Sequence, residues 1–261
     1  MSIKVKCKAV KDRTGEQNIN NKGCKMQIKT YEDYDNVYVE FKDKYNAIVH
    51  TNYARFKEGN VKNPFYPSVY GIGYLGLGKY KSSNLNDNKK FTKQYSYWIE
   101  MIKRGYSNNL KIKRPTYSNC IVCEEWYNFQ NFGEWFDKNY YEVENYRMEL
   151  DKDILFKGNK EYSPDVCIFV PQFMNTLFIK SNSKRGDYKI GVSMCRNKYI
   201  AQINKYGEHL YLGNFDTEQE AYEKYKAEKE SYITEIANKY KNVIPSCLYN
   251  TMINYRVEEN D

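Results

Sequence analysis

Residues Lys198–Ala221, KYIAQINKYGEHLYLGNFDTEQEA, carry the clearest structural pattern in the C-terminal third of the chain. Its alternation of apolar and polar residues predicts strands near Lys198–Asn204 and Glu208–Leu212. A further strand is expected upstream, near Tyr188–Met194. Three short strands followed by a helix predict a small α+β domain in which the helix covers one face of the sheet.

The helix that follows has a clear sequence signal for its start. Thr217-Glu-Gln-Glu220 spells a capping box, in which the Thr217 hydroxyl accepts a hydrogen bond from a first-turn amide and Glu220 reaches back to the backbone. Apolar side chains then recur along one helix face: Ala221, Tyr225, Tyr232, Ile236 and Tyr240. We expect this face to pack on the sheet, so that the opposite sheet face is free to contact a partner.

Charge is distributed unevenly over this domain. The whole chain has a formal net charge of +8, but it is rich in Lys, Asn, Tyr and Ile, whose codons are AT-rich, so the total charge is a weak indicator of nucleic-acid binding. Residues 180–214 contain seven basic and two acidic residues, whereas residues 215–241 contain five basic and seven acidic ones. A basic sheet in front of a slightly acidic helix can lie in the major groove of DNA, which admits a β-ribbon.

Four motifs span this domain: Gly191-Val192, Tyr199-Ile-Ala-Gln-Ile203, Leu210-Tyr-Leu-Gly-Asn-Phe215 and Thr217-Glu-Gln-Glu-Ala221. Together they resemble the AP2 family of DNA-binding domains, and the resemblance implies that outward side chains of the sheet contact bases and phosphates. By position these are Ser193, Arg196, Lys198, Gln202, Asn204, His209 and Tyr211. Arginines of the family's first strand are replaced by Ile190, Ser193 and Cys195, so base specificity does not transfer. The alternative is a protein-binding module on the same scaffold.

A second set of motifs lies between Phe91 and Leu177. They are Trp98-x-x-Met101-x-x-Arg104-x-Tyr106, Cys120-Ile-Val-Cys-Glu-Glu-Trp126, Asn128-Phe129-x-x-Phe132, Leu150-Asp-Lys-Asp153, Gly158-Asn159, Tyr162-Ser-Pro-Asp165 and Cys167-Ile-Phe-Val-Pro171. Together they resemble phage HNH homing endonucleases, which implies a ββα-metal domain. Phage proteins of this type often join such a domain to an AP2-like one.

The resemblance implies a catalytic site that is incomplete in this chain. An HNH site uses a His as general base and a carboxylate that holds a divalent metal ion. Asp151 stands at the metal-carboxylate position, Lys152 replaces the His, and Asn159 matches the loop Asn that orients the base. Lys is a poor base because it is protonated near neutral pH. Asp153 or Asp165 could supply a further Mg²⁺ ligand in a shifted register.

Two hypotheses about function stay open. In the first, the chain is a phage-encoded protein of homing-endonuclease type that binds double-stranded DNA and cleaves it with Mg²⁺ at a variant site. In the second, the scaffold has lost catalysis, and the chain binds and inhibits a protein of a host defence system. Both hypotheses place the protein in the cytoplasm of a bacterial host.

The N-terminal part has short alternating stretches, Lys25–Tyr31 and Asn36–Phe41, which predict a small β-barrel. Gly23-x-Lys25-Met26-x-Ile28 and Phe56-Lys-x-Gly59-x-Val61-x-Asn63-Pro64 resemble SH3-like barrels attached to phage nucleases. The expected organisation is a barrel over 1–79, a linker over 80–90, an HNH-like domain over 91–182, an AP2-like domain over 183–244 and a C-terminal tail over 245–261.

Other patterns do not support further sites. Cys120-x-x-Cys123 has no second Cys-x-x-Cys, so a zinc ion is not expected. Gly71-x-Gly73-x-x-Gly76 spells a dinucleotide fingerprint without the βαβ unit that such a fingerprint requires, so no small-molecule cofactor is expected. The chain has neither a long apolar run nor an N-terminal secretory pattern, and its seven scattered cysteines suit a reducing compartment.

Overall fold

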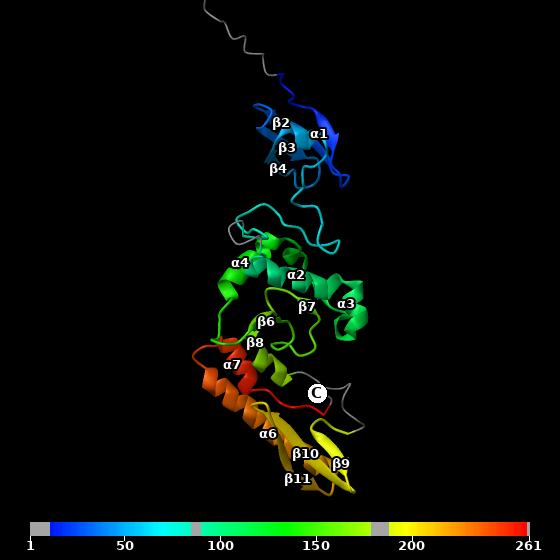
Figure 1. The fold of residues 1–261 in the computed structure, drawn as a ribbon. Coiled ribbons are helices and arrows are strands. Elements are labelled where there is room, and N and C mark those ends of the chain that lie inside the picture. The colour runs from blue at the N-terminus through cyan, green and yellow to red at the C-terminus, as the bar shows by residue number, and fades with distance from the viewer. Residues whose placement is uncertain (1–10, 85–89, 179–187, 260–261) are drawn as a thin grey trace, which may run out of the picture. The chain divides into compact units, whose positions relative to one another are not determined.

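The computed structural model describes residues 11–84, 90–178 and 188–259 (Figure 1). It is a mixed α+β structure, as the sequence predicts. Its contacts divide the chain into two compact units, 1–136 and 137–261, and the division falls inside the segment 91–182 that is expected to be one domain. Among the described residues, no helix combines the length and the apolar character needed to cross a membrane.

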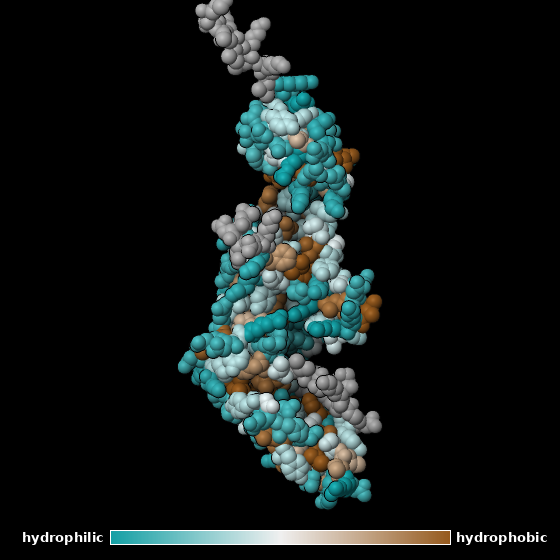
Figure 2. Space-filling model, viewed as in Figure 1, coloured by the Kyte–Doolittle hydropathy of each residue, from teal (hydrophilic) through white to brown (hydrophobic). Residues whose placement is uncertain are grey.

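The first unit begins with a four-stranded antiparallel sheet. Its elements are β1 (Gln17–Ile19), β2 (Lys25–Tyr31), β3 (Val37–Phe41), β4 (Ile48–Thr51) and the short helix α1 (Tyr53–Lys57). Alternate residues of β3, Val37, Val39 and Phe41, are completely buried and belong to the same core as Phe56 of α1. The visible surface over β2, β3 and β4 is mostly hydrophilic (Figure 2).

This sheet is open, which corrects the expectation of a closed barrel over 1–79. Within the described residues, the strand order is β1-β2-β3-β4, and the two outer strands do not pair with each other. Closure would require the outer strands β1 and β4, of three and four residues, to pair with each other at a matching tilt and stagger. Helix α1 and Val61 complete the core instead.

The rest of the first unit has an aromatic core. Its elements are α2 (Lys93–Tyr106), α3 (Asn108–Lys113), η1 (Pro115–Tyr117), β5 (Ile121–Val122), η2 (Glu124–Tyr127) and α4 (Phe129–Asn139). Helices α2 and α4 both contribute to this core. Trp98 is fully buried, and its indole nitrogen donates a 2.7 Å hydrogen bond to the carbonyl of Trp126. Gly73 lies so close to Trp98 that a Cβ atom would come within 2.8 Å of the ring, so this glycine serves close packing.

The second unit contains two small sheets and its longest helix. Its elements are β6 (Met148–Asp151), β7 (Glu161–Tyr162), β8 (Ile168–Pro171), α5 (Gln172–Asn175), η3 (Thr176–Phe178), β9 (Val192–Cys195), β10 (Lys198–Lys205), β11 (Glu208–Phe215), α6 (Glu218–Tyr240) and α7 (Ser246–Ile253). β6 pairs antiparallel with β8, and β9 to β11 form an antiparallel sheet in the order β11-β10-β9. The predicted capping box at the start of α6 is confirmed, because Thr217 and Glu220 make both reciprocal hydrogen bonds.

Within the segment 245–261, expected to be a tail, helix α7 and Val257 take part in the core of this unit. Leu248 and Met252 of α7 are buried against Ile233 and Ile236 of α6. Val257 is buried in the core under the three-stranded sheet. An eight-residue helix offers only two turns of apolar periodicity, which is too few for the pattern to be recognised in the sequence.

Candidate functional site

The register of the three-stranded sheet separates a covered face from an uncovered one. Ala201 and Ile203 of β10 are buried in the core beneath α6. Because side chains alternate along a strand, Gln202 and Asn204 point to the other face of the sheet. The residues directly opposite on β11 share that face, because Gln202 pairs with Tyr211 and Asn204 pairs with His209.

The same face continues onto β9. Lys198 and Ile200 lie two residues apart on the same face of β10 as Gln202. Ser193 pairs directly with Ile200, so Ser193 and Lys198 both lie on the uncovered face. The structure therefore brings together the strand residues implied by the AP2 resemblance: Ser193, Lys198, Gln202, Asn204, His209 and Tyr211. Ser193 and Gln202 are half-buried and the other four are exposed. We call these six residues the outer face.

Arg196 lies at the tip of the hairpin that joins β9 to β10. Arg196 and Asn197 have φ angles of 49° and 63°, the left-handed conformation of the tight turns that join antiparallel strands. Asn adopts this conformation readily, whereas Arg does so at some cost. The exposed Arg196 side chain therefore projects from the end of the outer face.

The positive charge of the sheet is smaller than the sequence count suggests. Lys198 forms an ion pair with Asp216, and Lys205 pairs with Glu228 of α6 at 2.6 Å. Lys189 pairs with Glu259 at 2.8 Å. Three of the seven basic residues in 180–214 are therefore partly neutralised. Lys205 points to the face of the sheet that α6 covers. Lys180, Lys184 and Arg185 lie outside the described residues.

Asp151, the expected metal carboxylate, ends strand β6 and shapes the loop that follows. Its Oδ1 accepts hydrogen bonds from the backbone amides of Asp153 at 2.8 Å and of Ile154 at 2.7 Å. Burial raises the pKa of the Asp151 carboxyl, and the nearby charge of Asp153 raises it further. The carboxyl group therefore stabilises a turn at a position where its negative charge is disfavoured.

Lys152 and Asn159, the other two expected catalytic residues, belong to the same loop. The Lys152 side chain is buried, with its Nζ 3.3 Å from Asp153 Oδ2 and 5.8 Å from the centre of the Tyr162 ring. Asn159 donates 2.7 Å hydrogen bonds to the carbonyls of Lys152 and Glu161. Asn159 thus holds the backbone of Lys152, the residue that stands at the position of the base.

The expected metal ligands are not gathered into one group. Asp153 is half-buried beside Lys152, whereas Asp165 is exposed. Within residues 11–84, 90–178 and 188–259, no cluster of three or more His, Cys, Asp or Glu side chains is placed to hold a metal ion. A metal ion in this loop would therefore depend on the Asp151 and Asp153 pair and on ligands from water or substrate.

Lys229 of α6 is a half-buried cation that the sequence motifs do not single out. Burial lowers the pKa of its amine from 10.5 to about 8. Lys229 follows Tyr225 by four residues and precedes Tyr232 by three, so it lies on the helix face that the two tyrosines define. A lysine at this spacing within an apolar helix face is the sequence signal that could have indicated it.

Comparisons with family models, with curated proteins and with solved structures find no match to this chain. Three places combine chemically active groups: the outer face with Arg196, the loop from Asp151 to Glu161, and the surroundings of Lys229.

Proposed function

We propose that the chain binds double-stranded DNA through the outer face of the sheet β9–β11. The observation that supports this proposal is the register that gathers a cation, two amides, a hydroxyl, an imidazole and a phenol on the sheet face opposite α6. These groups donate and accept the hydrogen bonds that read base edges and position phosphates. The hairpin tip adds Arg196, whose planar guanidinium suits phosphate or guanine.

The chain offers a direct test on its two outward cations. The double variant Arg196→Asn, Lys198→Gln removes both charges, and Asn tolerates the left-handed backbone at position 196. We expect the affinity for a mixed-sequence DNA duplex, measured by fluorescence anisotropy in low salt, to fall by about tenfold or more. Lys224→Gln is the matched control, because Lys224 is an exposed cation of α6.

A third variant sharpens the test. Asp216→Asn frees Lys198 from its ion pair and removes a negative charge beside the outer face, so duplex affinity should rise. Unchanged affinity in the double variant would contradict the proposal. Weak duplex binding by the unaltered protein, combined with stable recovery of one host protein in a pull-down, would instead favour the protein-binding inhibitor.

A second candidate function, metal-dependent DNA cleavage, is favoured by one observation. Asp151 and Asp153 lie close enough for their charges to disfavour one another, and a divalent cation would relieve that repulsion. Asp153 forms an ion pair with the Lys152 side chain, and Asn159 donates a hydrogen bond to the Lys152 carbonyl. These two contacts fix Lys152, which stands at the position of the general base. This candidate would make the chain an HNH-like nuclease with Mg²⁺ at Asp151.

The test is cleavage of plasmid or phage DNA with Mg²⁺ or Mn²⁺. Asp151→Asn is the informative variant, because the amide oxygen can still accept from the backbone amides of Asp153 and Ile154 while the charge is lost. Asp33→Asn is the matched control, since Asp33 caps a turn in the same way, through the amides of Asp35 and Asn36. Metal-dependent cleavage that Asp151→Asn abolishes and the control retains supports a nuclease; equal cleavage by both variants rules out Asp151 as a ligand.

A further inference from the structure

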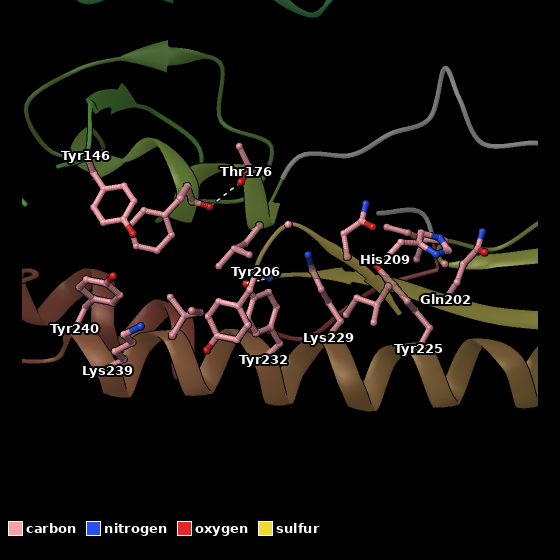
Figure 3. A pocket seen from close by; sticks show the side chains of 18 residues that line it. Tyr146, Thr176, Gln202, Tyr206, His209, Tyr225, Lys229, Tyr232, Lys239 and Tyr240 are labelled. Carbon is pink, nitrogen blue, oxygen red and sulfur yellow. Dashed lines mark hydrogen bonds between the residues drawn. The ribbon is translucent and has the colours of Figure 1, made fainter. Parts of the chain in front are cut away.

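The second unit contains a cavity of about 820 Å³ (Figure 3). One wall is α6, which contributes Tyr225, Lys229 and Tyr232. Another wall is the β10–β11 hairpin, and the short helices α5 and η3 contribute further residues. The volume lies within the range of about 300 to 1,000 Å³ that is typical of small-molecule sites.

The lining of this cavity is cationic. Among the described residues, it includes the cations Lys229 and Lys239 and neither Asp nor Glu. Within the described residues, Lys229 has no carboxylate within ion-pair distance. Partial burial of an ammonium group without a counter-ion is costly, and the lowered pKa of Lys229 reflects that cost. An anion bound beside Lys229 would offset this cost.

The lining is also rich in aromatic rings. The Tyr206 and Tyr232 rings meet edge to face with centroids 5.1 Å apart, and the backbone amide of Tyr206 donates a 2.9 Å hydrogen bond to the Tyr232 hydroxyl. Tyr146 packs on Phe173 with centroids 4.2 Å apart. Tyr206 and Tyr146 are 58% and 42% exposed, so part of each side chain is accessible to a ligand.

The hairpin side of the cavity supplies hydrogen-bonding groups from three residues that also belong to the outer face. Gln202, Asn204 and His209 all contribute to the lining. Their amides and imidazole can both donate and accept, which matches the mixed edge of a nucleobase. The cavity thus combines an unpaired amine, exposed aromatic rings and paired donors and acceptors (Figure 3).

We propose that this cavity binds a purine nucleoside monophosphate, with the phosphate at Lys229 and the base among the tyrosines. A lysine ammonium is a common phosphate partner, and aromatic side chains stack on bases. The proposal goes beyond DNA binding and beyond the sequence patterns, from which no small-molecule ligand is expected. It does not require that the outer face binds DNA, but Gln202, Asn204 and His209 belong to both sites, so DNA and nucleotide would compete for them.

The phosphate half of the proposal is tested by calorimetric titration of the full chain with adenosine and guanosine 5′-monophosphate. We expect Lys229→Met, which keeps the length of the side chain and removes its charge, to weaken binding of the nucleotide by about tenfold or more. Lys229→Arg keeps the charge and should stay within about threefold of the unaltered protein. Lys224→Met, on the exposed side of α6, is the matched control and should have no effect.

The aromatic half is tested at Tyr206, whose φ of 54° is a conformation that Asn tolerates. Tyr206→Asn should weaken nucleotide binding, whereas Tyr70→Asn should not, because Tyr70 is an exposed tyrosine with a φ of 51° in the first unit. Inorganic phosphate and adenosine should each bind at least about tenfold more weakly than the nucleotide.

Three results would overturn the proposal: no heat of binding with either nucleotide at millimolar concentration, equal affinity in Lys229→Met, or equal affinity for phosphate alone. The variant Arg196→Asn, Lys198→Gln separates this proposal from DNA binding. Neither Arg196 nor Lys198 lines the cavity, so the variant should lose duplex affinity and keep nucleotide affinity. Loss of nucleotide affinity in that variant would mean that the nucleotide occupies the outer face instead.

Discussion

At the scale of single residues, Lys229 makes stability depend on pH. Its pKa is about 8 in the folded chain and 10.5 without burial, so the unfolded state binds more protons between these values. Stability therefore rises with pH through this window, and the cost of the charged amine is fully present below about pH 8. The size of the pKa shift limits the destabilisation caused by the charged amine to about 3 kcal/mol, and the partial exposure of Lys229 lowers this value further.

Lys229→Met should consequently stabilise the protein near neutral pH, by about 1 to 2 kcal/mol, and this gain should disappear toward pH 10. Thermal unfolding of the variant and of Lys224→Met, followed from pH 6 to pH 10, measures the difference. The other titratable groups that line the cavity are His209, Lys239, Tyr146, Tyr206, Tyr225, Tyr232 and Tyr240. Lys229→Met leaves all of them in place. A pH-independent difference between the two variants would show that Lys229 is not the group responsible.

At the scale of elements, local signals were sufficient where neighbouring residues act on one another. The start of α6 follows from Thr217 and Glu220 alone, and alternation along β10 predicts which of its side chains share a face. In β11 a bulge between Tyr211 and Gly213 breaks the alternation. The loop from Asp151 to Asn159 shows the limit. Asp151, Lys152 and Asn159 are close in sequence, so their presence in one loop is predictable. The burial of Lys152 is not, because it depends on Tyr162 and on the surrounding fold.

Long-range packing explains the remaining differences from the sequence expectations. Whether a four-stranded sheet closes depends on strand length and tilt, which alternation does not encode. Helix α7 is stabilised by burial of Leu248 and Met252 in a core shared with α6, and not by a long periodic pattern of its own. The cavity around Lys229 is likewise formed by elements that are distant in sequence, so its shape could not be predicted from any single motif.

At the scale of the whole molecule, the net charge of +8 and the charge available for DNA are different quantities. Lys189, Lys198 and Lys205 are paired with carboxylates, so the formal charge overstates the positive charge that these side chains would offer to DNA. Only contacts that displace counterions from phosphates appear in the salt dependence of binding, because each contributes about 0.9 to the slope of log K against log salt concentration.

If the outer face binds DNA as proposed, the salt dependence of binding by the full chain counts its phosphate contacts. If Arg196 and Lys198 each contact a phosphate, Arg196→Asn with Lys198→Gln should lower the magnitude of the slope by about two. Asp216→Asn should raise affinity at every salt concentration while Lys198 keeps its contact, so its slope should not fall. The measurement is a duplex titration at several salt concentrations. A double variant with weaker binding and an unchanged slope would place both side chains on bases, and a variant with neither change would place the DNA elsewhere on the chain.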